Sequence, residues 1–205
     1  LMLVNVEFHY DFASPNSYFS HRIIPGIEER TGVKFKYVPI LLGGIFKATN
    51  NKSPMEQFAE VKNKQEYNAR ETERFIDKHN LKKYTRNPHF PVNTLHIMRG
   101  ACYALGKSFE ANYIETMYQC MWERGLNMSD PAIIEQALNE YGLPAADIIA
   151  ATQEPAVIQI LLDSSTTSVE KGNFGSPTFF VNDEIFFGKD RLRDVEEEIL
   201  AQLRF

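Results

Sequence analysis

Residues 10–18 read Tyr-Asp-Phe-Ala-Ser-Pro-Asn-Ser-Tyr, and they form the turn from an alternating segment into a helical one. Ser14 and Ser17 have the spacing of a redox Cys-x-x-Cys motif, which at such a turn would indicate thiol–disulfide exchange. A serine hydroxyl cannot form a disulfide, so this chemistry is excluded here. What remains is a helix start, which attracts an anion through its free N–H groups and its dipole. Ser followed by Pro also begins many ordinary helices, which leaves a purely structural interpretation open.

The periodicity around this turn predicts a strand, a helix and a second strand. Residues 4–10 alternate between apolar and polar side chains, which is typical of a strand. The following helix is expected to end at Thr31-Gly32, since glycine is a common helix C-cap. Residues 33–38 predict the second strand, which Pro39 would stop. This order implies a right-handed crossover and parallel pairing.

The middle of the chain shows only helical patterns, and strands return near its end. The helices are expected over residues 54–79, 92–105 and 109–122, and from Asp130-Pro131 and Glu154-Pro155. Strands are expected over residues 178–181 and 184–187, joined by a turn at Asn182-Asp183 and followed by an amphipathic helix from Leu192 to Leu203.

The order β-α-β, then helices, then β-β-α predicts an α/β protein with a thioredoxin-like fold and a large all-helical insertion. We assign residues 1–44 and 172–205 to the thioredoxin-like domain and residues 45–171 to the helical insertion domain. One feature fits poorly, because a central strand covered on both faces is normally apolar throughout, whereas the first strand carries Asn5, Glu7 and His9. These side chains would face a cleft or a subunit contact. His9 is either an acid–base group or a structural histidine with satisfied hydrogen bonds.

Composition excludes several classes of partner. The 205 residues carry a net charge of −5, which argues against nucleic acid or an anionic membrane as a partner. No apolar run approaches the roughly 20 residues of a membrane span. Cys102 and Cys120 lie in helical patterns without a recognisable secretory signal, which indicates free buried thiols and a cytoplasmic location. Either thiol is a nucleophile in principle, but neither has motif context. The five histidines are scattered, so no metal site is expected.

Motifs distributed over nearly the whole chain resemble the family of 2-hydroxychromene-2-carboxylate isomerases and kappa-class glutathione transferases, the glutathione-dependent side of the DsbA-like group. The matching stretches are residues 11–18, Leu-Leu-Gly-Gly-Ile-Phe at 41–46, Asn-Lys-Ser-Pro at 51–54, Lys-Gln-Glu-Tyr at 64–67, Phe-Pro-Val-Asn-Thr at 90–94, Phe-Gly-Ser-Pro-Thr-Phe at 174–179 and Phe-Gly-Lys-Asp-Arg-Leu at 187–192.

The resemblance implies that the anion at the helix start is the thiolate of glutathione, with Ser14 as the catalytic serine that donates a hydrogen bond to the sulfur. Lowering a thiol pKa by about two units requires about 2.7 kcal/mol. A helix N-terminus contributes about 0.3–2 kcal/mol and a charge-assisted hydrogen bond about 1.5–3 kcal/mol, so the two together suffice. No general base is evident beside Ser14, so it is not expected to be a covalent nucleophile. Ser17 is interpreted as structural.

The remaining glutathione-binding residues rest on the same resemblance. It implies that Ser176 precedes a cis Pro177 and offers its backbone to the cysteinyl part of glutathione, and that Asp190 receives the γ-glutamyl ammonium. It also implies a backbone contact at Lys189, and it makes Asn51 and Lys64 candidates for the peptide and carboxylate ends. Pro91 and Asn93 belong to the expected substrate pocket. Without the resemblance, Asp190 is explained as a helix-start acid and Lys64 as solvated surface.

The expected function is therefore glutathione-dependent isomerisation of an aromatic-catabolism intermediate of the 2-hydroxychromene-2-carboxylate type, by reversible addition of the thiolate. Two alternatives stay open. One is a kappa-like transferase that conjugates glutathione to electrophiles, and the other is a non-catalytic glutathione- or peptide-binding module. The expected partners are a small aromatic substrate and, as the assembly, a second copy in a homodimer.

Overall fold

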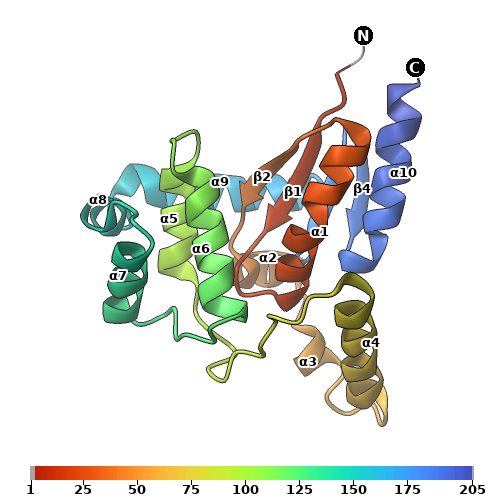
Figure 1. Ribbon diagram of the computed structural model, residues 1–205, viewed down its shortest axis with the longest axis horizontal. Coiled ribbons are helices and arrows are strands. Elements are labelled where there is room, and N and C mark those ends of the chain that lie inside the picture. The colour runs from red at the N-terminus through yellow and green to blue at the C-terminus, as the bar shows by residue number, and fades with distance from the viewer. Residues whose placement is uncertain (1–2, 205) are drawn as a thin grey trace.

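A computed structural model of the chain describes residues 3–204 and has a four-stranded mixed sheet at its centre (Figure 1). The strands are β1 (Val6–Tyr10), β2 (Phe35–Pro39), β3 (Thr178–Val181) and β4 (Glu184–Phe187), in the spatial order β2-β1-β3-β4. β1 is parallel to β2, and β3 is antiparallel to both of its neighbours. The expected β-α-β and β-β-α order and the parallel pairing are confirmed.

The crossover helix α1 (Pro15–Thr31) begins and ends as its sequence predicts. Ser14 is the N-cap, Pro15 occupies the first turn, and Gly32 ends the helix at a φ of 72° with its N–H donating to the carbonyl of Glu28. α10 (Leu192–Leu203) packs beside α1, after the short 3₁₀ helix η1 (Lys189–Arg191). These helices cover one face of the sheet (Figure 1).

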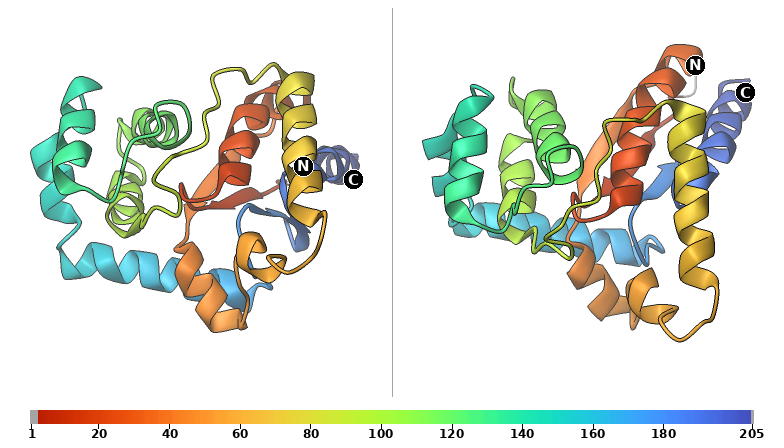
Figure 2. Two further views of the ribbon diagram at one scale, coloured as in Figure 1. Left: turned by 90° about the horizontal axis from the view of Figure 1, so that it is seen from below. Right: turned by 60° about the horizontal axis from the view of Figure 1, so that its bottom comes forward.

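The helices between β2 and β3 form most of the rest of the molecule. They are α2 (Leu42–Thr49), α3 (Pro54–Gln57), α4 (Lys64–His79), α5 (Leu95–Ala104), α6 (Glu110–Trp122), α7 (Pro131–Glu140), α8 (Ala145–Ala151) and α9 (Pro155–Glu170). Figure 2 shows α5 to α8 gathered on one side of the sheet, while α9 runs from this group back to the strands. Within residues 3–204, no single helix is long and apolar enough to cross a membrane. The bent pair of α8 and α9 reaches the required length and apolar composition only when both helices are taken together.

The polar side of β1 faces the end of α9. His9 Nδ1 lies 2.7 Å from Ser168 Oγ, and Nε2 lies 2.8 Å from Glu7 Oε1. Lys171 completes the group, because its ammonium pairs with Glu7 at 2.9 Å. His9 is 2% exposed, and burial lowers its pKa. The cleft expected here is therefore wrong for His9, which is a structural histidine, whereas Asn5, directly before β1, is exposed. The sequence could not show that α9 returns to this face.

Other differences from the expected elements have local causes. The helix expected over residues 54–79 is broken into α3 and α4, and Asn63 between them has a φ of 72°. α2 forms where no helix was expected, and Pro39 belongs to β2, which tolerates it as an edge strand. α8 was not expected, because its seven residues are too few to show the spacing of apolar side chains that is typical of a helix.

Buried aromatic side chains join the sheet to α6. Trp122 donates through Nε1 to the carbonyl of Phe12 at 2.7 Å, and the rings of Phe12 and Tyr118 meet edge to face at 4.8 Å. This packing fixes the turn before α1 against the helices. α9 contacts both the strands and α5, so the domain boundaries at residues 44 and 172 stay a prediction.

Candidate active site at the start of α1

Ser14 lies at the start of α1, where its hydroxyl makes two hydrogen bonds. Its Oγ donates to the carbonyl oxygen of Ser176 at 3.1 Å and accepts from the N–H of Ser17 at 3.2 Å. The second bond is the N-cap of the structural interpretation, and the first links Ser14 to a segment 162 positions away. Ser14 is 6% exposed, and the first turn of α1 carries no acidic residue. The positive end of the helix dipole is therefore not neutralised within that turn.

The segment before β3 brings Ser176 against the start of α1. The Ser176-Pro177 peptide bond is cis, as expected. Ser176 Oγ lies 2.6 Å from Ser17 Oγ and also accepts from the N–H of Asp11 at 3.2 Å. Ser17 is fully buried by these contacts, which agrees with its structural interpretation. The structure thus brings Ser14 and Ser176 together through both side chain and backbone.

Lys189 and Asp190 form an ion pair in η1. Lys189 Nζ lies 2.9 and 3.1 Å from the two carboxylate oxygens of Asp190 and 4.8 Å from the centre of the Phe75 ring on α4. The Asp190 side chain is 75% exposed, whereas that of Lys189 is buried. No role was expected for the Lys189 side chain, because the sequence around a single lysine does not show which side chains it contacts.

Asn51 and Lys64 differ in how they relate to this site. Asn51 Nδ2 donates to the carbonyl oxygen of Phe174 at 2.9 Å, which ties the end of α2 to the segment that carries Ser176. Lys64 begins α4, with its ammonium 4.8 Å above the ring of Phe58. Within residues 3–204, no hydrogen bond connects Lys64 to the other candidate residues.

Pro91 and Asn93 are exposed on the loop before α5, and the Phe90-Pro91 bond is also cis, which the sequence did not predict. Thr94 follows directly and is buried, and its hydroxyl donates to Asp11 Oδ1 at 2.6 Å. This bond places the loop beside the turn that precedes Ser14. Asp11 and Thr94 were missed as site residues, because nothing in the sequence pairs them across 83 positions.

The two cysteines are buried and free. Burial raises the pKa of Cys102 to about 12 and that of Cys120 to about 11, so neither forms a thiolate near neutral pH. Within residues 3–204, no group of three or more His, Cys, Asp or Glu side chains is arranged to hold a metal ion.

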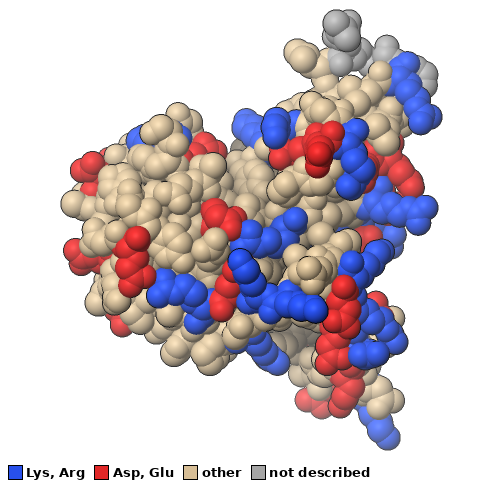
Figure 3. Space-filling view, viewed as in Figure 1, with Lys and Arg blue, Asp and Glu red and all other residues tan. Residues whose placement is uncertain are grey.

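A cavity of about 410 Å³ opens farther along α1, between this helix, α6 and the segment after α4. Its lining includes Tyr18, Arg22 and Glu123, together with Lys82 and Lys83. Figure 3 shows basic side chains gathered at the hollow in the centre of this face, with acidic ones among them. Ser14, Ser176 and Asp190 do not line this cavity.

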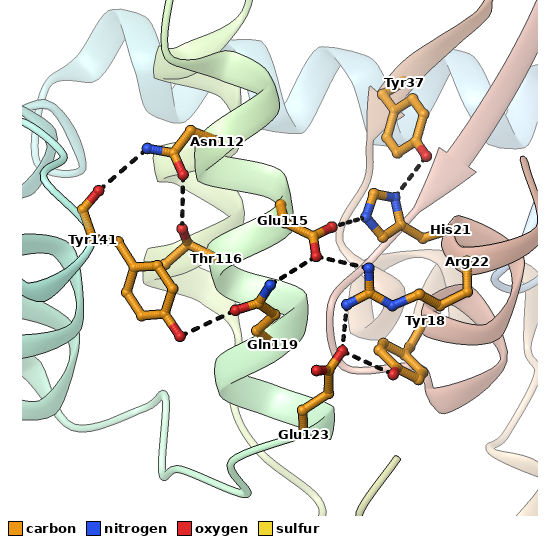
Figure 4. A network of polar contacts seen from close by, with 10 residues as sticks. All are labelled: Tyr18, His21, Arg22, Tyr37, Asn112, Glu115, Thr116, Gln119, Glu123 and Tyr141. Carbon is orange, nitrogen blue, oxygen red and sulfur yellow. Dashed lines mark hydrogen bonds and ion pairs between the residues drawn. The ribbon is translucent and has the colours of Figure 1, made fainter. Parts of the chain in front are cut away.

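A polar network spans the wall of the cavity between α1 and α6 (Figure 4). Glu115 accepts from His21 Nε2 and from Arg22, each at 2.7 Å. Glu123 accepts from Arg22 and from the hydroxyl of Tyr18. The hydrogen bond from His21 is the largest of several contacts that lower the pKa of Glu115 to about 2. This network holds α1 to the helical part of the molecule.

Comparison with known proteins places this geometry in context. The chain is 28% identical to a 2-hydroxychromene-2-carboxylate isomerase of Sphingobium xenophagum, over 97% of this chain and all of that protein. It is 22% identical to glutathione S-transferase kappa 1 of Caenorhabditis elegans, over 92% of this chain and 88% of that protein.

Solved structures show the same fold. A 2-hydroxychromene-2-carboxylate isomerase matches with a TM-score of 0.84 at 22% identity, over 97% of this chain and 96% of that one. The cytosolic disulfide reductase DsbM of Pseudomonas aeruginosa, solved with GSH, matches with a TM-score of 0.62 at 13% identity, over 98% of this chain and all of that one. A model of the DSBA-like thioredoxin domain matches residues 5–200. With this match over nearly its whole length, the chain belongs to the family of DSBA-like thioredoxin domains.

Proposed function

We propose that this protein is a glutathione-dependent isomerase that acts on a small aromatic-catabolism intermediate of the 2-hydroxychromene-2-carboxylate type, in the cytoplasm and as a homodimer. The observation that carries the proposal is the Ser14 hydroxyl at the head of a 17-residue helix, in contact with the Ser176 carbonyl. The isomerase name of the relative at 28% identity supports the reaction class.

The residues at this point fit glutathione in four respects. The first turn of α1 has no acid that would repel a thiolate. The carbonyl oxygen of Ser176 is an acceptor suited to a peptide N–H, and the exposed carboxylate of Asp190 is suited to an ammonium group. The amide of Asn51, which donates to the carbonyl of Phe174, is of a kind that can pair with a peptide group. We propose that Ser14, Ser176 with Pro177, Lys189 and Asp190 hold glutathione together with Asn51 and Lys64.

Bound glutathione would supply a thiolate that adds reversibly to the substrate and is released unchanged. The Ser14 hydroxyl has one proton to donate in a hydrogen bond, and it donates it to the Ser176 carbonyl. Turning this proton toward the sulfur would free the Ser176 carbonyl to accept from the ligand backbone. One internal hydrogen bond is then replaced by two to the ligand, and the bond to sulfur is strongest when the sulfur is ionised.

Pro91 and Asn93 are proposed to contact the aromatic substrate, because their loop is joined through Thr94 to the turn before Ser14. A second candidate function is transfer of glutathione to an electrophile, which the relationship to a kappa transferase supports. In that reaction the same serine would stabilise the thiolate, but the sulfur would stay attached to the product. A non-catalytic binding module is the third candidate.

The test is a turnover assay with a 2-hydroxychromene-2-carboxylate substrate that follows the free thiol titre alongside the substrate absorbance. We expect no turnover without glutathione, and an unchanged thiol titre after complete conversion. Loss of one thiol per product would favour the transferase. Binding of glutathione without turnover of either kind would favour the binding module. S-methylglutathione, which lacks the thiol proton, serves as the control and should inhibit without supporting turnover.

A further inference from the structure

The buried carboxyl group of Asp11 joins three segments that surround the candidate site. Asp11 Oδ1 accepts from the N–H of Ala13 at 2.9 Å and from the hydroxyl of Thr94 at 2.6 Å, and Oδ2 accepts from the N–H of Leu42 at 2.8 Å. These donors belong to the turn before α1, the start of α5 and the start of α2, which meet at one end of β1 (Figure 1). Asp11 is 1% exposed, so water contributes little to holding it.

The backbone of Asp11 reaches the two serines of the site. Its N–H donates to Ser176 Oγ at 3.2 Å, and its carbonyl accepts from the N–H of Ser14 at 3.1 Å. Through its side chain and backbone together, Asp11 therefore contacts both sides of the Ser14–Ser176 pair and the helices that flank it. Thr94 is the side-chain contact from α5, and the N–H of Leu42 is the backbone contact from α2.

A carboxyl group buried here needs an explanation beyond packing. Burial of an acid is costly unless it is hydrogen-bonded, and three donors meet that requirement. Burial raises the pKa of Asp11, and the bonds from Leu42, Thr94 and Ala13 oppose this effect. A negative charge near a bound thiolate would also disfavour ionisation of the sulfur. If Asp11 favours ionisation of the bound thiol, it must therefore do so by positioning Ser14 and Ser176 and not by its charge.

We propose that Asp11 is a positioning residue, which holds the Ser14 hydroxyl and the Ser176 backbone in the arrangement that binds the glutathione sulfur, with Thr94 as its partner from α5. This inference rests on the proposed function. It makes α5 a support for the Ser14 hydroxyl through the hydrogen bond between Thr94 and Asp11. This support is in addition to the bond from Trp122 of α6 to the carbonyl of Phe12.

The pKa of the bound thiol distinguishes three roles of Asp11: positioning Ser14, acting through its charge, and only stabilising the fold. Replacing the carboxyl with an amide adds no negative charge, so electrostatics alone would leave the thiol pKa unchanged or lower it. Loss of the Ser14 hydrogen bond to sulfur would instead raise it. A residue that only stabilises the fold would change the unfolding midpoint without moving the thiol pKa.

The experiment is an ultraviolet titration of the thiolate in the complex with glutathione, for the full chain and its variants. We expect Asp11→Asn to raise the midpoint by about one pKa unit, and Thr94→Val to raise it by about half as much. Thr94→Ser keeps the hydroxyl and should keep the wild-type midpoint. Glu28→Gln is the matched control, because Glu28 accepts from the backbone N–H of Phe35 at 2.8 Å on the far half of α1. It should lower stability and leave the thiol midpoint unmoved.

Ser14→Ala separates this inference from the proposed function. If Ser14→Ala raises the midpoint while Asp11→Asn and Thr94→Val do not, the role of Asp11 is wrong and the role of Ser14 stands. If the wild-type complex shows no lowered midpoint, both are wrong. Should Asp11→Asn fail to fold, Thr94→Val decides, and an unmoved midpoint in that variant overturns the proposal.

Discussion

At the scale of single residues, a serine stands where the spacing of a redox motif would place a cysteine. Ser14 has the helix start and the neighbouring cis Pro177 segment, but its hydroxyl donates a hydrogen bond instead of forming a disulfide. The sequence predicted this residue, because a motif at a strand-to-helix turn is visible in a local pattern. For Lys189 and Asp190, the sequence predicted a role for the Asp190 carboxylate and for the Lys189 backbone. It did not predict their ion pair, because side-chain geometry is not visible in a sequence.

Ser14→Ala is expected to raise the pKa of the bound thiol by about one to two units, the equivalent of one charge-assisted hydrogen bond. Turnover near neutral pH should fall at least about tenfold, following the thiolate fraction. Affinity measured well below that pKa should change little, because a neutral thiol gains less from the donor. Ser17→Ala is the control and should be much milder. A titration midpoint that Ser14→Ala leaves in place would reduce Ser14 to a helix cap.

Asp190→Asn is expected to weaken glutathione binding about tenfold, because an amide attracts the γ-glutamyl ammonium less than a carboxylate does. Isothermal titration calorimetry of wild type and variant checks this. Cysteinylglycine lacks the γ-glutamyl group and should bind both equally. Asp194→Asn, one turn away and paired with Arg191 at 3.2 Å, is the matched control. Equal losses for both ligands would show that Asp190 acts on the fold and not on the ammonium.

At the scale of elements, the contact between α1 and α6 includes Glu115, a carboxylate whose pKa is lowered by its partners on α1 and α6. The sequence predicts both helices, because each has a clear apolar stripe. It does not predict their contact, since His21 and Glu115 are 94 positions apart. The same holds for α9, whose return to β1 explains the polar side chain of His9 in a strand that periodicity predicts correctly.

Glu115→Gln is expected to destabilise the protein at neutral pH and to flatten its acid dependence. The lowered pKa of Glu115, about 2 against an ordinary 4.5, means that the unfolded chain binds the proton first as the pH falls. The stability from Glu115 is therefore present above about pH 4.5 and lost as the pH falls toward 2. Denaturant unfolding at several pH values measures this effect. Glu135→Gln, an exposed change on α7, is the control. Parallel curves for Glu115→Gln and wild type would contradict the prediction.

At the scale of the whole molecule, the fold, the family and the pairing of Ser14 with Ser176 were predictable, and the contacts that support this pair were not. The order of strands and helices indicates a thioredoxin-like fold, because it is carried by periodicity and turn residues. The site, in contrast, joins Asp11, Thr94 and Ser176, which only the folded chain brings together. Long-range polar contacts of this kind leave no periodic trace in a sequence.

The molecule as a whole is expected to lack disulfide oxidoreductase activity, although it shares its fold with DsbA-like enzymes. Positions 14 and 17 carry serine, and both cysteines are buried with raised pKa values. Insulin reduction with glutathione or dithiothreitol should proceed at the rate without protein. A variant with both Cys102 and Cys120 changed to alanine is the control. Catalysed reduction by that variant would require a redox centre that the described residues do not provide.

The central claim is that the sulfur of glutathione is held by the Ser14 hydroxyl, and a crystal structure of the complex tests it most directly. We predict that the sulfur lies within hydrogen-bond distance of Ser14 Oγ, about 3.5 Å or less, with the Ser176 carbonyl accepting from the cysteinyl N–H. A sulfur more than about 5 Å from Ser14 Oγ, far beyond hydrogen-bond reach, would contradict the account.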